Sequence, residues 1–182
     1  MDIRKWTVGA VVAAITLGIA GCSGDATGIE ATAPASPRPA GTGLLAQAVV
    51  RADIASTVAD AGVPDNAPDY GRMSEGLADT VASCVVAFKG FGEKGTTVDF
   101  ARFEAVTREL RERQWTEDPG ARKEDRTADG TVGRAETILR QRGWIMTADL
   151  SEFQDEGVIT LRAIDQACFK KYRGQLEVPD GL

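Results

Sequence analysis

A run of oxygen-bearing side chains near the middle of the chain has the residue types and spacing to hold a hard cation. In the segment DRTADGTVGRAE the oxygen donors are Asp125, Thr127, Asp129, Thr131 and Glu136. Donors at alternate positions can converge on calcium, a glycine such as Gly130 permits the sharp turn, and a final glutamate can bind with both oxygens. The sequence therefore predicts a candidate calcium site at these five residues.

The same twelve residues resemble the calcium loop of EF-hand and dockerin-type proteins. Asp125, Asp129, Gly130 and Glu136 match loop positions one, five, six and twelve, and Val132 matches the apolar position eight. The resemblance implies that side-chain oxygens coordinate calcium here. The chain departs from the pattern at Thr127, where Asp or Asn is usual, and at Pro119-Gly120, where an amphipathic helix would enter. The alternative interpretation is a solvated connection with an Asp-Gly turn.

The chain contains no histidine, and this absence excludes several chemistries. Ser-His-Asp and Cys-His catalysis, histidine zinc sites and imidazole pH sensing all need that side chain. Four acids gather in one segment, namely Asp149, Glu152, Asp155 and Glu156. A hydrolase built on paired carboxylates would need two acids facing each other. Since no nucleophile motif is present either, we expect a non-catalytic protein, with a carboxylate hydrolase as the alternative.

The first 22 residues have the layout of an export signal that ends at a cysteine. Arg4 and Lys5 precede an apolar run from residue 6 to residue 20, shorter than the about 20 residues that a membrane-crossing helix needs. The run ends in Ile19-Ala20-Gly21-Cys22, which resembles the lipobox of bacterial lipoproteins. The resemblance implies that residues 1–21 are a cleaved signal peptide and that Cys22 receives lipid. A plain secretory signal and an uncleaved anchor are the alternatives.

The charge of the chain bears on its partners and its location. The net charge is −6, and loss of residues 1–21, which carry +1, would leave −7. An acidic chain argues against nucleic acid, because phosphate binding needs clustered Lys and Arg. It is also repelled by an anionic lipid surface. We therefore expect a membrane partner only through the lipid on Cys22, on the outer face of the cell membrane, together with an unknown protein or small-molecule partner.

Two cysteines, Cys84 and Cys168, are left over once Cys22 is assigned to lipid attachment. A pair of cysteines in an oxidising compartment is typical of a disulfide. Two buried free thiols are the alternative. Apart from the candidate calcium ion, we expect no cofactor.

The remaining patterns predict the elements that position these residues. Residues 22–43 are rich in Gly, Ala, Pro, Ser and Thr and predict a disordered tether, followed by one domain over 44–182. We expect helices over 44–62 and 96–115, strands over 80–90, 144–150 and 158–165, and loops over 63–72, 116–130 and 151–157. Residues 131–143 fit either a helix or a strand.

Three finer predictions concern the buried faces and the ends of these elements. In the first helix, the apolar stripes are Leu45, Val49 and Ala52, and Leu44, Ala48, Ala55 and Val58. The strand over 80–90 is apolar on both sides, which predicts a central strand covered on both faces. Thr97 or Asp99 can cap the second helix. The fold class is α+β, with helices packed on a small, mostly antiparallel sheet.

These observations together favour a lipid-anchored, extracytoplasmic binding or accessory module that is not an enzyme and whose ligand the sequence does not identify. A surface hydrolase would be distinguished by two acids facing each other across a cleft. A structural protein of the cell envelope would be distinguished by large exposed apolar patches.

Overall fold

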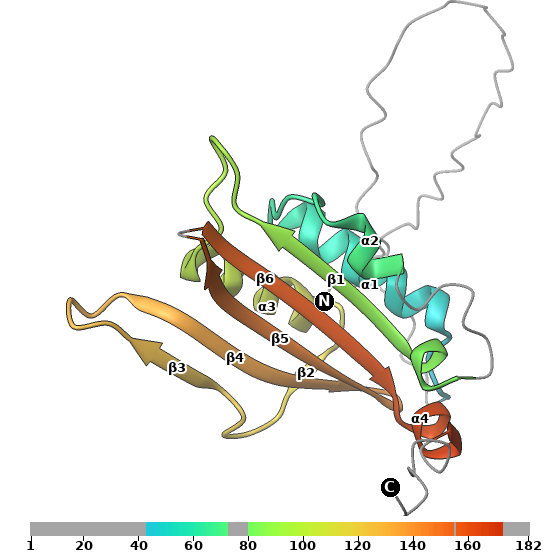
Figure 1. The fold of residues 1–182 in the computed structure, drawn as a ribbon. Coiled ribbons are helices and arrows are strands. Elements are labelled where there is room, and N and C mark those ends of the chain that lie inside the picture. The colour runs from blue at the N-terminus through green and yellow to red at the C-terminus, as the bar shows by residue number, and fades with distance from the viewer. Residues whose placement is uncertain (1–42, 73–79, 155, 173–182) are drawn as a thin grey trace, which may run out of the picture. The chain divides into compact units, whose positions relative to one another are not determined.

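The structure is a computed structural model that describes residues 43–72, 80–154 and 156–172, all within one compact unit, Pro37–Leu182. The helices of this part of the chain are α1 (Gln47–Asp60), α2 (Pro68–Arg72), α3 (Phe100–Glu112) and α4 (Gln166–Tyr172), and η1 (Val81–Cys84) is a short 3-10 helix (Figure 1). The strands are β1 (Val85–Phe91), β2 (Thr116–Glu117), β3 (Lys123–Arg126), β4 (Val132–Gln141), β5 (Trp144–Phe153) and β6 (Glu156–Asp165).

The strands form one antiparallel sheet in the order β1-β6-β5-β4-β2, and β3 also pairs with β4. Strands β4 and β5 are joined by Arg142 and Gly143, which both have positive φ. Such a two-residue turn matches the twist of antiparallel neighbours. The predicted α+β class with a mostly antiparallel sheet is confirmed, and the segment that fitted either a helix or a strand is the strand β4.

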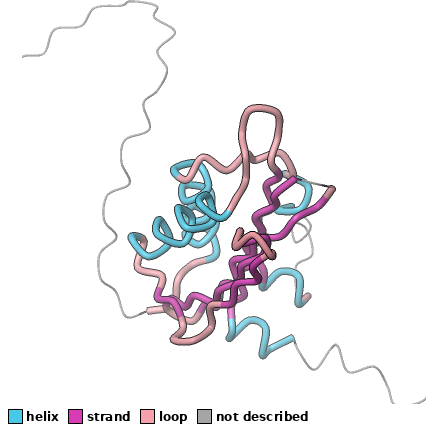
Figure 2. Tube along the Cα trace, turned by 90° about the vertical axis from the view of Figure 1, so that its left-hand side faces the viewer, coloured by secondary structure: helices cyan, strands magenta, loops and turns pink. Residues whose placement is uncertain are grey.

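Helices α1 and α3 pack together on one face of the sheet, where the core lies (Figures 1 and 2). Side chains alternate along the strands, so every second residue reaches this core. The buried strand residues are Val86, Phe88, Ala135, Leu139, Trp144, Met146, Ala148, Leu150, Ile159, Leu161 and Ala163. We call the opposite face the outer face; it carries Ala87, Lys89, Phe91, Val158, Thr160, Arg162, Thr147 and Asp149, among others.

The two predicted helices both form, but the two stripes predicted for the first helix are only partly right. Leu45 and Val58 are buried, whereas four other residues of the stripes are exposed, namely Leu44, Ala48, Ala52 and Ala55. In α3, Asp99 caps the first turn by accepting a hydrogen bond from the amide of Arg102 at 3.0 Å. The buried residues of α1 are Val50, Asp53, Ile54, Thr57 and Val58. Asp53 is buried because the indole nitrogen of Trp115 donates a hydrogen bond to its carboxylate at 3.1 Å. Burial of a polar side chain is tolerable when it is paired in this way.

Three segments predicted as loops contain regular structure. Residues 63–72 include the short helix α2, which begins at a proline, as is common at the first helical position. Residues 116–130 include the short, charged strands β2 and β3. Between 151 and 157, strand β5 continues to Phe153 and strand β6 starts at Glu156.

Strand β1 is an edge strand of the sheet, so the prediction of a central strand over 80–90 is wrong. The outward-facing side chains of β1 are nevertheless half-buried, because helix α2 packs against this strand. The side-chain amide of Asn66 both donates to and accepts from the backbone of Phe91, at 3.0 and 2.9 Å. Gln47 donates to the carbonyls of Ser83 and Val85 at the other end of β1. These contacts protect the edge.

Candidate functional site

The predicted disulfide is present and links Cys84 to Cys168, whose Cα atoms are 5.4 Å apart. It joins η1, which leads into the edge strand β1, to helix α4 at the end of the chain's last strand. Cys84 is almost completely buried. The bond therefore closes the domain between its first and its last strand and leaves neither thiol free for chemistry.

Cys22, the predicted signal peptide over 1–21 and the predicted tether over 22–43 lie outside the described residues, except for Gly43. Among the described residues, no helix combines the length and the apolar character that crossing a membrane requires. Lipid attachment at Cys22 therefore stays a prediction.

The twelve residues that resemble a calcium loop form a β-hairpin between β3 and β4, whereas an EF-hand loop lies between two helices. Asp125 lies on β3 opposite Arg134, and Glu136 lies on β4 opposite Lys123. Two of the five candidate ligands therefore have a cationic residue as one cross-strand neighbour, and Glu136 also has an acid, Asp149, opposite it on β5.

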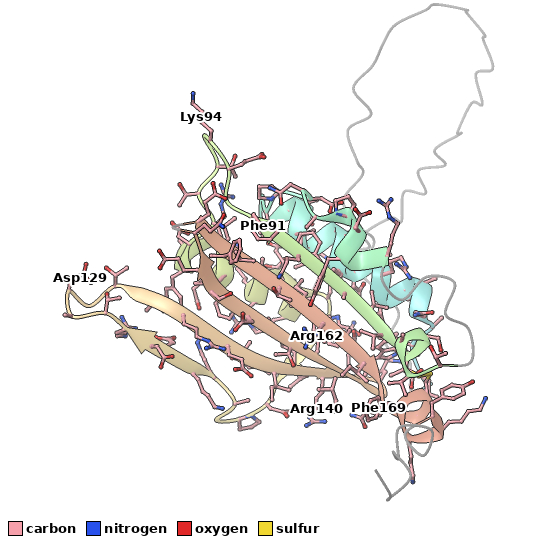
Figure 3. The ribbon with its side chains drawn as sticks, in the orientation of Figure 1. Phe91, Lys94, Asp129, Arg140, Arg162 and Phe169 are labelled. Carbon is pink, nitrogen blue, oxygen red and sulfur yellow. A yellow bond between two sulfur atoms is a disulfide. The ribbon has the colours of Figure 1, made fainter. Side chains whose placement is uncertain are left out.

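The other three candidate ligands meet at the tip of this hairpin, where Figure 3 shows Asp129. The hydroxyl of Thr127 contacts the carboxylate of Asp129, and the amide of Thr131 donates to the same carboxylate at 3.1 Å. The bond from Thr127 and then the amide of Thr131 lower the pKa of Asp129 below its ordinary value. In the described part of the chain no three acidic or cysteine side chains are grouped as metal ligands. Calcium binding stays a prediction.

The acids of the candidate hydrolase site are not arranged as a facing pair. Asp149 and Glu152 are three residues apart on β5 and therefore point to opposite faces of the sheet. Asp149 lies 3.8 Å from Arg134, which balances its charge. Glu156 begins the next strand opposite Phe153, and Asp155 lies outside the described residues. The described members of this set do not face one another, and the acid opposite Asp149 is Glu136 on β4. Hydrolysis by paired carboxylates stays an alternative prediction.

A groove beside the edge strand is the feature with the character of a binding site. It lies between α1, α2 and β1 and has a volume of about 330 Å³. Its apolar walls are formed by Ile54, Val58, Val63, Val86 and Phe88, together with Ala55 and Ala59. Ligand sites are typically concave, largely apolar and a few hundred Å³ in volume.

Small residues create the space for this groove. Ala55 and Ala59 lie one turn apart on α1, and both are exposed although Ile54 and Val58 beside them are buried. On α2, a Cβ at Gly71 would lie 3.0 Å from the carbonyl oxygen of Ala87, so a glycine here allows the helix to approach the strand. The groove is thus formed by short side chains on both helices.

The rim of the groove is polar. Arg51 of α1, Arg72 of α2, Lys89 of β1 and Asp65 of the connecting segment line it. Just beyond the end of β1, the amide of Gly92 donates to the carbonyl of Gly157 at 2.8 Å, in register with the pairing of β1 and β6. Because hydrogen-bonded residues alternate along an antiparallel strand, the backbone groups of the even-numbered residues of β1 point toward β6. The backbone groups of Ala87 and Lys89 therefore point toward the open edge. The groove offers an apolar interior with hydrogen-bonding groups at its border.

The fold and this site define an α+β domain with a lateral apolar groove at the edge of its sheet. No family model matches the chain, and no curated protein matches it either.

The sequence patterns did not predict the groove, because residues 63–72 were interpreted as a loop. The available signal was the pair of alanines one turn apart beside Ile54 and Val58.

Proposed function

We propose that this chain is a lipid-anchored, extracytoplasmic binding module that holds a small, largely apolar molecule in the groove between α1, α2 and β1. The groove is the observation that carries the proposal, because its volume of about 330 Å³ is that of a small-molecule site. The buried disulfide fits an oxidising compartment, in which such bonds persist. The lipobox resemblance at residues 19–22 supports the anchor.

The groove suits a small molecule better than an extended peptide. A peptide that joined the sheet at β1 would need a run of unpaired backbone groups. Asn66 already occupies the backbone groups of Phe91, Gln47 contacts the carbonyl of Val85, and Gly71 of α2 packs close to Ala87. Since only a short stretch of edge remains between these contacts, an added strand would find few partners.

The groove can be tested with an uncharged fluorescent probe, N-phenyl-1-naphthylamine, and the full chain carrying Cys22→Ala, so that neither lipid nor detergent competes for the dye. We expect the dye to brighten on binding, and Ala55→Phe to abolish the signal because the larger ring fills the groove. Ala52→Phe is the matched control, since Ala52 is exposed on the same helix and does not line the groove. Equal signals from the two variants would contradict the proposal.

The anchor is tested separately by fractionating cells that express the wild-type chain or Cys22→Ala after growth with a labelled fatty acid. We expect label in the membrane fraction for the wild type alone. Label retained by Cys22→Ala would contradict lipid attachment at this residue and would leave the groove unaffected.

A further inference from the structure

A row of aromatic and cationic side chains crosses the outer face beside β1, and it shares only Lys89 with the rim of the apolar groove. Arg162 donates a hydrogen bond to the hydroxyl of Tyr70 at 2.9 Å. The ammonium of Lys89 lies 5.0 Å from the ring centroid of Tyr70 and 5.6 Å from that of Phe91. Phe91 in turn packs edge-on against Phe153, with 6.3 Å between ring centroids. We call these five residues the cation–aromatic row.

The two cations of the row contact aromatic residues and have no acidic partner within the described part of the chain. Among the described residues, neither Lys89 nor Arg162 forms an ion pair, whereas Arg134 on the same face pairs with Asp149 at 3.8 Å. Lys89 and Asp149 belong to one row of cross-strand neighbours with Thr160 between them, so two strand spacings, about 10 Å, separate their backbones. Asp149 is the diagonal neighbour of Arg162 on β5, but its ion pair is with Arg134. The positive charge at Lys89 and Arg162 is therefore available to a ligand.

The sheet register brings the two cations together under Tyr70. Lys89 lies opposite Thr160, and Ala87 lies opposite Arg162, so the two cations are diagonal neighbours on adjacent strands, about 7–8 Å apart at the backbone. Both contact Tyr70, which reaches over the outer face from α2. The hydroxyl of Tyr70 accepts from Arg162 and still has its own proton to donate.

The apolar end of the row is also open to solvent. Phe153 is 58% exposed, and with Leu44 it is one of two large apolar side chains exposed to this degree in the described residues. Figure 3 shows Phe91 and Arg162 on the face of the sheet that is turned toward the viewer, on the neighbouring strands β1 and β6. Hydrogen-bond donors thus lie at one end of the row, and exposed ring surface lies at the other.

We propose that the cation–aromatic row binds an organic anion. Lys89, Arg162 and the hydroxyl of Tyr70 hold its phosphate or carboxylate group, because charge-assisted hydrogen bonds from Arg and Lys suit these oxygens. The rings of Phe91 and Phe153 contact the ring or apolar part attached to the acid group. This site shares Lys89 with the rim of the groove, but Arg162, Phe91 and Phe153 do not line the groove, whose test uses an uncharged probe.

Isothermal titration calorimetry of the full chain with inorganic phosphate, phenyl phosphate and benzoate, at constant ionic strength, tests the proposal. We expect phenyl phosphate or benzoate to bind with a Kd of about 1 mM or lower. Arg162→Gln and Lys89→Gln should each weaken binding about tenfold, the effect of losing one charged hydrogen bond. Tyr70→Phe, which keeps the ring and removes the hydroxyl, should weaken it less.

Two control variants test whether a loss of binding comes from the site itself, from the change in overall charge or from misfolding. Lys123→Gln makes the same charge change on β3, at the other edge of the sheet opposite Glu136, and should leave binding unchanged. Phe153→Ala should reduce the advantage of phenyl phosphate over inorganic phosphate without altering phosphate binding. The proposal is overturned if neither ring-bearing anion binds, or if Lys123→Gln weakens binding as much as Lys89→Gln in variants whose melting temperatures match the wild type.

Discussion

Removing the disulfide should cost this domain a large part of its stability. The bond joins Cys84 to Cys168 across 84 residues of sequence. In the chain-entropy model a loop of this length limits the unfolded chain enough to stabilise the fold by about 4–5 kcal/mol. Since domains of this kind are stable by only about 5–15 kcal/mol, the loss would be about a quarter of the total or more.

The packing of α4 indicates why the native state also depends on this bond. Helix α4 has only seven residues, and its main contacts are with η1 and β6. So short a helix is not stable by itself in water. Without the link to Cys84, α4 should separate easily from η1 and expose Tyr172, which is 8% exposed in the folded domain.

Urea unfolding of the full chain, followed by tryptophan fluorescence, measures this effect. We expect Cys84→Ala with Cys168→Ala to lower the free energy of unfolding by about 4–5 kcal/mol and the melting temperature by roughly 10–20 °C. A reductant should destabilise the wild type to the same degree and leave the double variant unchanged. A double variant within about 1 kcal/mol of the oxidised wild type would refute the entropy argument.

Two further predictions concern close packing and pH. Gly157→Ala should lower the free energy of unfolding by more than about 2 kcal/mol in urea, because its Cβ would lie 1.6 Å from the carbonyl oxygen of Val98; a wild-type midpoint would contradict this. The bonds from Thr127 and Thr131 hold the pKa of Asp129 below its ordinary value, so their contribution is present above that ordinary value and is lost as the pH falls through the lowered one. NMR of the Thr131 amide should therefore show the hairpin tip loosening in acid before the sheet does, and Asp129→Asn should remove the dependence.

Long elements with a clear period were predictable from the sequence. The alternation in β5 places Trp144, Met146 and Ala148 in the core, and the stripe of α3 buries Phe103 and Leu110. In such elements the local pattern and the tertiary packing agree, so the pattern alone is sufficient to predict the element and its buried face. The disulfide was predictable for a different reason, since the resemblance to a lipobox assigns Cys22 to lipid and leaves two cysteines to pair.

The features that determine the candidate sites were not predictable, because distant residues create them. Asp53 interrupts the apolar pattern of α1, and its burial is explained by a partner 62 residues away, the indole of Trp115. Helix α2 is five residues long and contains proline and glycine, which favour a loop when the segment is considered alone. Its packing on β1 forms one wall of the groove and also places Tyr70 over the outer face.

The charge of the whole chain argues against nucleic acid and an anionic lipid surface as partners, but it does not decide whether a small anion can bind locally. A net charge of −6 predicts repulsion from anionic partners when all charges are counted together. At short range, however, the placement of each charge matters more than the sum, because exposed charges separated by more than about 10 Å are largely screened by salt. Lys89 and Arg162 contact aromatic groups in place of acids. The proposed anion site therefore depends on where Lys89 and Arg162 are held, beside the ring and the hydroxyl of Tyr70, and not on the net charge.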